Sequence, residues 1–164
     1  MSAPLLVADS GPLIALARLG LLAVPARLYR EMLVTATVWH EVTREPRPAD
    51  AKALSAAFDG GLLVVVDDPT SIPAALVDAR LDDGERFALS LALSRKATVL
   101  VDERRGRAAA AELGLPVLGT LGLLVQARGQ GLIGPLRPLA DALLASGYFL
   151  AQPLVDRTLA LIGE

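Results

Sequence analysis

Short apolar runs alternate along this chain with longer segments whose apolar residues recur at helical spacing. The runs, at residues 5–8, 32–35, 62–66, 98–101 and 116–118, read as strands, and helical patterns separate them. We expect the runs at 62–66 and 98–101 to be buried. Such alternation implies right-handed crossovers and a parallel sheet covered on both faces. The sequence therefore predicts an α/β fold, a three-layer α/β/α domain with a central parallel sheet of about five short strands.

Helical patterns fill the segments between these runs and continue to the end of the chain. We expect helices over residues 13–19, 38–44, 49–58, 82–95, 104–113, 120–128, 136–144 and 154–162. A chain of 164 residues fits one domain with one continuous core. We therefore expect a single domain over residues 1–164, in which a helical extension from about 120 to 164 caps the sheet.

Composition narrows the function classes. No uncharged apolar stretch reaches the ~18 residues that a transmembrane helix needs, and the amino terminus lacks the basic residues of a signal peptide. The chain has no cysteine, so a cytoplasmic location is the default. The net charge of -2 lacks the basic excess that nucleic-acid-binding domains usually carry. The hydrophobic fraction of 53% favours self-association or a protein partner.

Four acidic residues occupy positions next to the predicted strands and helix starts. Asp9 and Asp102 directly follow strands, whereas Glu41 and Glu85 lie near the beginnings of helices. In an open parallel sheet, ligands bind beyond the carboxyl ends of the strands. We therefore expect the four carboxylates to meet at one mouth of the sheet.

Gathering these acids requires a cation. Two like charges about 4 Å apart repel by about 4 kcal/mol at an effective dielectric near 20. With no thiol and with His40 as the only imidazole, oxygen ligands and Mg²⁺ or Mn²⁺ are favoured over zinc. Such ions serve the cleavage of phosphate esters. The pattern leaves open whether one ion or two are bound.

The segments around the four acids resemble the motifs of PIN domains, the fold of VapC-type toxin ribonucleases. The first acid, Asp9, lies in LLVADSGPLIALARLG with Ser10 as its hydroxyl neighbour. Glu41 lies in TATVWHEV, Glu85 in LDDGERFALSLA and Asp102 in ATVLVDERRGRAAAAELGL. The resemblance covers nearly the whole chain and implies the PIN-like form of the three-layer fold.

The chain looks closest to a PIN branch of predicted nucleic-acid-binding proteins whose third motif is D-x-G-E. The corresponding segments are residues 82–85 (DDGE), 102–105 (DERR) and 119–122 (GTLG). In one departure, the third acid is Glu85, where many PIN nucleases have aspartate. Glutamate has one more methylene group than aspartate, so its carboxylate lies farther from the backbone. The number of bound ions and their affinity therefore stay open.

The resemblance implies a Mg²⁺- or Mn²⁺-dependent endoribonuclease in which water attacks in line and leaves 5′-phosphate and 3′-hydroxyl ends. It further implies the toxin of a type II toxin–antitoxin pair, with an RNA substrate, an antitoxin protein and a homodimer. On this basis Asp9 and Asp102 are direct ligands, Glu85 is a ligand or base, and Glu41 is a ligand partly through water. Ser10 donates a hydrogen bond to a carboxylate or phosphate.

Each of these residues also has a structural interpretation. Asp82 and Glu85 make a capping box, and Asp9 or Asp102 could simply start a helix. Thr120 is favoured as a helix cap. Arg104 and Arg105 either hold RNA phosphates or form a solvated helix face. Only the joint pattern favours a metal site.

Two other functions compete with the nuclease. The first is a catalytically inert PIN-fold module that binds RNA or a protein partner. The second is a phosphatase of the haloacid-dehalogenase type with Asp9 as its nucleophile. That chemistry requires a second aspartate two residues after the first, and position 11 is Gly11.

Overall fold

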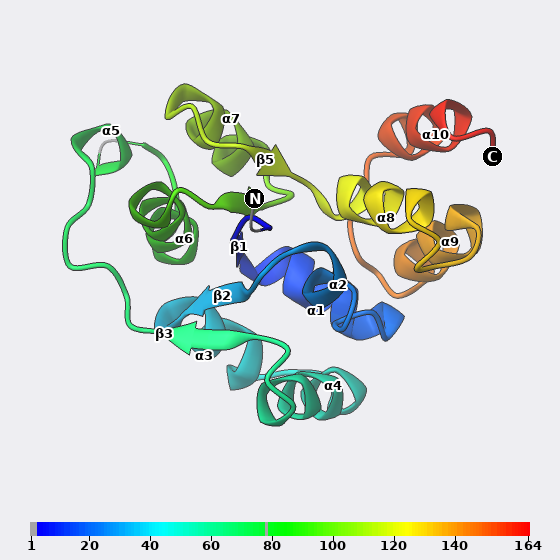
Figure 1. Ribbon diagram of the computed structural model, residues 1–164, viewed down its shortest axis with the longest axis horizontal. Coiled ribbons are helices and arrows are strands. Elements are labelled where there is room, and N and C mark those ends of the chain that lie inside the picture. Colours follow the sequence, from blue (N-terminus) through cyan, green and yellow to red (C-terminus); the bar gives the residue numbers. More distant parts are fainter. Residues whose placement is uncertain (1–2, 78) are drawn as a thin grey trace.

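A five-stranded parallel sheet forms the centre of the protein, in a computed structural model that describes residues 3–77 and 79–164. The strand order is β3-β2-β1-β4-β5, and every neighbouring pair is parallel (Figure 1). The strands are β1 (Leu6–Ala8), β2 (Met32–Thr35), β3 (Val64–Val66), β4 (Thr98–Leu100) and β5 (Val117–Leu118). The predicted α/β/α class is therefore confirmed.

Successive strand residues point to opposite faces, and each face has its own core. On one face, Leu6, Val34 and Leu100 pack beneath helices α1 (Ser10–Leu19), α3 (Ala36–Arg44) and α4 (Pro48–Asp59). On the other face, Val7 and Val99 pack beneath α6 (Asp83–Arg95) and α7 (Arg104–Glu112). Both faces of the central strands are buried, so these strands read as continuous apolar runs rather than as alternating ones.

Three helices form the carboxyl-terminal part of the chain: α8 (Thr120–Gly129), α9 (Leu136–Ala145) and α10 (Gln152–Leu161). They share a third core with Ala15 of α1, and Figure 1 shows them grouped at one end of the molecule. The main contacts of α9 are with α1 and α8, and those of α10 are with α8 and α9. The extension therefore packs mainly on α1 and on its own helices, while Leu123 of α8 joins the core on one face of the sheet.

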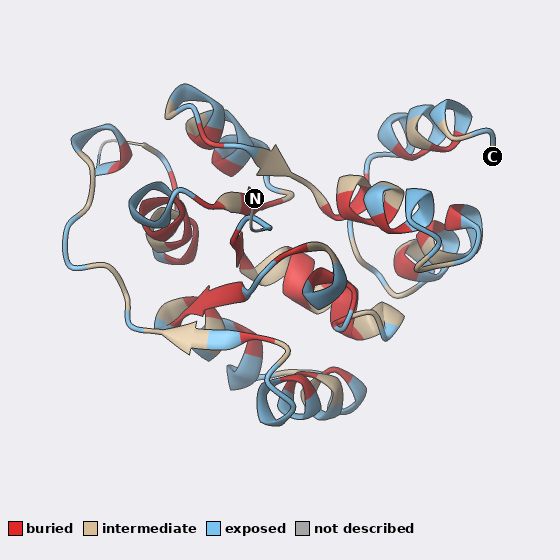
Figure 2. Ribbon diagram, in the orientation of Figure 1, coloured by how far each residue is buried: buried red, intermediate tan, exposed pale blue. Residues whose placement is uncertain are grey.

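The strand predicted over 62–66 is shorter and more exposed than expected. β3 begins at Val64, whose exposed fraction is 37%, and its other two residues are only half-buried. Figure 2 shows β1 and β2 as buried and β3 as intermediate to exposed. The physical reason is that β3 lies at the edge of the sheet, with β2 as its neighbour on one side. A run of valines does not distinguish an edge strand from a central one.

Two short helices were not predicted. They are α2 (Pro25–Leu28) and α5 (Ala74–Val77), each of four residues. One turn of helix is too short to display the 3.6-residue period. Across the described ranges 3–77 and 79–164, none of the helices combines the length and apolar character needed to cross a membrane.

Candidate functional site

The carboxyl ends of β1 and β4 open into a groove of about 1230 Å³. These two strands are neighbours at the middle of the sheet, where the chain order reverses, which is where open α/β sheets bind ligands. The groove is lined by the seven residues that the sequence predicted as site residues: Asp9, Ser10, Glu41, Glu85, Asp102, Arg104 and Arg105.

Asp9 directly follows β1 and is buried, as is Glu85, each with 7% of its surface exposed. It occupies the N-cap position of α1, yet its side chain makes no capping hydrogen bond, so the carboxylate is not used to start the helix. Burial raises the pKa of Asp9 to about 7, a hydrogen bond from the Ser10 backbone opposes the shift, and the charges of Glu85, Asp82 and Glu41 add to it. The site thus holds an acid that ionises reluctantly unless a positive charge lies nearby.

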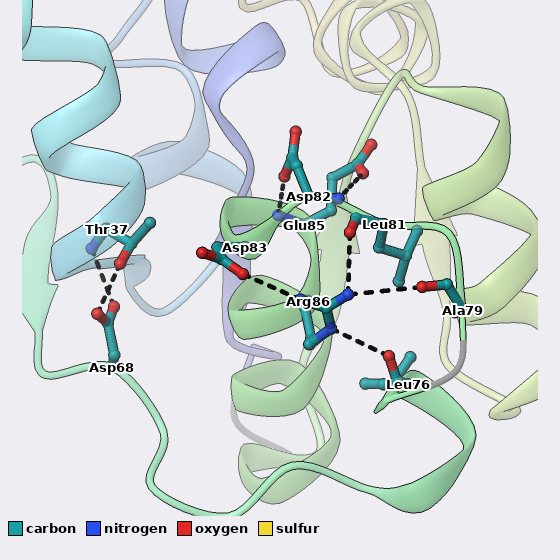
Figure 3. Close-up of polar contacts among 9 residues, drawn as sticks. All are labelled: Thr37, Asp68, Leu76, Ala79, Leu81, Asp82, Asp83, Glu85 and Arg86. Atoms are coloured by element: carbon teal, nitrogen blue, oxygen red, sulfur yellow. Dashed lines mark hydrogen bonds and ion pairs between the residues drawn. The ribbon is translucent and has the colours of Figure 1, made fainter.

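Glu41 lies in the second turn of α3, and the hydroxyl of Ser10 donates a hydrogen bond to its carboxylate. The first turn of α3 is held by Thr35, whose side chain accepts from the Val38 amide at 3.2 Å. Asp68 accepts from the amide and hydroxyl of Thr37 at 2.9 and 2.6 Å (Figure 3). The start of α3 is therefore fixed, and its next turn presents Glu41 to the end of β1.

Glu85 lies in the first turn of α6 and takes part in the predicted capping box. Its Oε2 accepts from the Asp82 amide at 3.0 Å, and its own amide donates to Asp82 Oδ1 at 2.8 Å (Figure 3). Burial raises the pKa of Glu85, partly offset by the Asp82 amide, and the charges of Asp82, Glu103 and Glu41 raise it further. The capping role uses Oε2, while the residue also lines the groove.

Arg86 organises the segment that leads into this helix, a role that its sequence context does not predict. Its guanidinium donates to the carbonyls of Leu76 and Leu81 at 3.1 and 3.0 Å and to Asp83 at 3.0 Å (Figure 3). A half-buried arginine that satisfies several carbonyls holds a loop in one geometry. Arg86 therefore fixes the approach to the capping box that holds Glu85.

Asp102 follows β4 and is held by three donors. Thr120 donates its amide to Oδ1 at 2.8 Å and its hydroxyl to Oδ2 at 2.6 Å. The hydroxyl of Tyr148 also donates to Oδ2. The N-cap of α8 is Gly119, so the predicted capping role of Thr120 is wrong: its hydroxyl holds Asp102 instead.

Three glycines lie against three of the acids. A Cβ atom on Gly84 would lie 2.6 Å from Glu41 Oε1, and one on Gly119 would lie 3.1 Å from Asp102 Oδ1. A Cβ on Gly106 would lie 3.6 Å from Glu85 Oε1. A side chain at position 84 would push the Glu41 carboxylate aside, whereas one at position 119 would first meet Arg107 Nη1, at 2.7 Å. Glycine lets each acid rest directly against a backbone.

The acids suit a hard divalent ion in their chemistry. All four offer oxygen donors, and their mutual repulsion favours a cation among them. Over residues 3–77 and 79–164, however, no three Asp, Glu or His side chains are arranged as ligands of one ion. The oxygens of Glu41, Glu85 and Asp102 instead accept hydrogen bonds from protein donors.

Arginines and apolar side chains complete the groove. Arg104 and Arg105 are exposed on the first turn of α7, and Arg80 and Arg107 line the same groove. The apolar part includes Leu118, Val125, Phe149, Leu154 and Leu161. The groove thus has acids at the strand ends, cations beside them and an apolar wall.

Comparison with known proteins finds a matching family model and solved structures with a similar fold. The family model for the PIN domain, DUF3368, matches residues 5–164. The PilT N-terminus domain protein SSO1118 from the hyperthermophilic archaeon Sulfolobus solfataricus superposes with a TM-score of 0.58 at 18% identity, covering 75% of this chain and 92% of that chain. PAE2754 from Pyrobaculum aerophilum gives a TM-score of 0.53 at 16% identity, covering 76% of this chain and 89% of that one.

At such identities the two structures show a common fold only. No curated protein matches the sequence at a significant level. The family match nevertheless spans nearly all of the chain and agrees with the motifs around Asp9, Glu41, Glu85 and Asp102. The chain belongs to the PIN-domain family, whose members are generally nucleases.

Proposed function

We propose that this protein is a Mg²⁺- or Mn²⁺-dependent endoribonuclease. The observation that carries the proposal is the convergence of four acids, from four separate segments, at the point where the strand order reverses. Membership of the PIN family supports a nuclease, and the oxygen-only donor set supports a hard divalent ion. A structural role alone does not explain Asp9, which is buried and caps nothing.

The residues that would hold the ion are Asp9, Asp102 and Glu85, with Glu41 contributing partly through water. When bound, Mg²⁺ or Mn²⁺ would orient the phosphate, activate water for in-line attack and stabilise charge on the leaving oxygen. The capping box occupies Glu85 Oε2 and leaves Oε1 to act as ligand or base. Ser10 holds Glu41 in place through its hydroxyl.

The proposed substrate is RNA. Arg104 and Arg105 flank the acids on exposed positions of the groove, where guanidinium groups can pair with phosphates. The wider proposal is the toxin of a type II toxin–antitoxin pair, acting as a homodimer with an antitoxin protein. Its support is the family resemblance together with exposed apolar side chains at Phe149 and Leu161, which are 85% and 87% exposed.

The test is cleavage of a 5′-labelled single-stranded RNA in Mg²⁺ or Mn²⁺. We expect cleavage by the wild type, products with 5′-phosphate and 3′-hydroxyl ends, and loss of cleavage in Asp9→Asn and Asp102→Asn. Asp68→Asn, which alters an aspartate outside the groove, is the control for purification and folding. Equal cleavage by Asp9→Asn, Asp102→Asn and the wild type would overturn the proposal.

One observation favours a second candidate, a PIN-fold module that binds RNA or protein without catalysis. That observation is the lack, among the residues that the structure describes, of three acids already arranged as ligands. Thermal unfolding separates the two candidates. A site for Mn²⁺ should add about 2.7 kcal/mol of stability at a hundredfold excess over the dissociation constant. An unchanged melting temperature would favour the inert module.

A further inference from the structure

The carboxyl-terminal helices contribute one side chain to the acidic end of the groove. Tyr148 lies between α9 and α10, and its hydroxyl donates a hydrogen bond to Oδ2 of Asp102. The two residues are 46 positions apart in the sequence. This contact therefore joins the helical extension to the carboxyl end of β4.

The backbone turn that precedes Tyr148 fixes the orientation of this residue. The end of α9 forms a Schellman motif, in which the Gly147 amide donates to Leu144 at 3.0 Å and the Tyr148 amide donates to Leu143 at 3.3 Å. Gly147 has φ of +87°, a conformation that favours glycine at this position. The motif reverses the chain immediately before Tyr148, and the ring then packs against the core of the helical extension.

The chain also leaves space for the phenol between the ends of two strands. A Cβ atom on Gly11 would lie 3.1 Å from the Tyr148 hydroxyl oxygen, which is tighter than ordinary van der Waals contact. Gly11 is two residues after Asp9, in the first turn of α1. The Tyr148 hydroxyl thus contacts the first turn of α1 and also donates a hydrogen bond to Asp102.

The donors on Asp102 are distributed unequally. Oδ2 accepts from the hydroxyls of Thr120 and Tyr148, whereas Oδ1 accepts from the Thr120 amide. An ionised carboxylate offers about four acceptor positions, so these three bonds leave about one, on Oδ1. Without Tyr148, Oδ2 would also have one free position, and the carboxylate would be held by Thr120 alone.

We infer that Tyr148 is a positioning residue of the metal site: its hydroxyl holds Asp102 through Oδ2 and leaves the free acceptor position on Oδ1, which would be available to an ion. The inference rests on the proposed function, because it assigns a role to Tyr148 through a proposed ligand. Partners that orient metal ligands are commonly needed for affinity, and their loss costs about 10- to 100-fold in metal affinity or activity.

The test compares the two tyrosines of the chain. Tyr148→Phe keeps the ring and removes only the hydroxyl. Tyr29→Phe is the matched control, because the Tyr29 hydroxyl also makes one side-chain hydrogen bond, to Gln126 at 3.1 Å, and Tyr29 does not line the groove. The measurement is the Mn²⁺ dissociation constant by calorimetry for the wild type and both variants, with unfolding midpoints recorded in metal-free buffer.

We expect Tyr148→Phe to weaken Mn²⁺ binding about 10-fold or more and Tyr29→Phe to leave it unchanged. An affinity in Tyr148→Phe equal to that of the wild type would overturn the inference and leave the proposed function standing. A wild type that binds no Mn²⁺ would overturn both. Should Tyr148→Phe fail to fold, Gly11→Ala takes its place: the added Cβ, 3.1 Å from the hydroxyl oxygen, would shift that hydroxyl slightly, so we expect a smaller weakening of Mn²⁺ binding, and an unchanged affinity would overturn the inference.

Discussion

Thr120 holds both carboxylate oxygens of Asp102, with its amide at 2.8 Å from Oδ1 and its hydroxyl at 2.6 Å from Oδ2. The same two-bond arrangement joins Thr37 to Asp68, at 2.9 and 2.6 Å. Asp102 lines the groove and Asp68 does not. The protein thus contains the same local structure twice, once beside the other acids and once away from them. Matching substitutions in the two pairs therefore separate the effect on local structure from the effect on function.

Asp102→Asn and Asp68→Asn should therefore differ in function far more than in stability. Asparagine keeps an oxygen that can accept from the threonine amide, so we expect both variants to unfold within about 1 kcal/mol of the wild type. Only Asp102→Asn removes a charge from the proposed metal site, so only that variant should lose Mn²⁺ binding in calorimetry. Equal Mn²⁺ affinity in the two variants would contradict the assignment of Asp102 as a ligand.

Gly84→Ala tests the close contact between α6 and Glu41. The new Cβ would lie 2.6 and 2.7 Å from the two carboxylate oxygens of Glu41, which must move and give up the hydrogen bond from Ser10. Glu41 is exposed, so the change in stability should be small, while Mn²⁺ affinity and RNA cleavage should fall.

Gly129→Ala is the control for that substitution. Gly129 ends α8 and has open space around its Cβ position. Alanine there should be neutral or stabilise by up to about 1 kcal/mol, with metal affinity unchanged. If Gly84→Ala binds Mn²⁺ as well as Gly129→Ala does, the placement of Glu41 at the site is wrong.

The raised pKa of Asp9 predicts a stability that depends on pH in metal-free protein. The folded state keeps a proton up to a pKa of about 7, whereas the ordinary value is 3.8. The unfolded state therefore binds fewer protons in this interval, and the free energy of unfolding should fall as pH rises from about 4 to about 7. At about 1.4 kcal/mol for each unit of difference, the full loss attributable to Asp9 is on the order of 4 kcal/mol.

Urea unfolding in EDTA at several pH values measures this effect. Asp9→Asn removes one of the two groove acids with a raised pKa, so it should reduce the decline, leaving the part that Glu85 contributes, and be more stable than the wild type at pH 8. Asp141→Asn, an exposed substitution on α9, makes the same change in formal charge and should keep the decline. A decline of the same size in Asp9→Asn would show that other groups cause it.

Arg104 and Arg105 should contribute to RNA affinity through phosphate contacts. In an Asp102→Asn background, which keeps the RNA intact, Arg104→Gln and Arg105→Gln should each weaken binding. Each lost contact should also reduce the slope of log affinity against log salt by about 0.7 for single-stranded RNA. Fluorescence anisotropy across a salt series measures both quantities. The exposed Arg27→Gln, outside the groove, should change neither; an equal effect of Arg27→Gln would indicate nonspecific attraction.

The positions of most strands and helices along the chain were predictable, because local apolar periodicity and capping residues determine them. β2 was expected at its observed bounds, and the start of α6 was expected from the capping box of Asp82 and Glu85. The exposure of β3 was not predictable, since its valines suit a central strand equally well, and strand order depends on contacts between distant segments.

The acids of the site could be predicted as a set, but the residues that hold them could not. Thr120 carried a signal in its GTLG segment, which favoured the wrong role because capping is the commoner use of such a residue. Tyr148 carried no signal, because its contact with Asp102 exists only after α9 and α10 have packed against the rest of the protein. The role of Arg86 was likewise not predictable from sequence, since its partners include backbone carbonyls, which every residue has.

The bond between Asp102 and Tyr148 also bears on when the groove is assembled during synthesis. Ala15, in the helix that follows Asp9, is buried against residues of α8, α9 and α10, which are synthesised more than 100 residues later. Domains generally fold as units as they are made. A nascent chain of this protein therefore carries its early acids without the groove that gathers them, and any activity should begin only after α8, α9 and α10 have been made and have packed on α1.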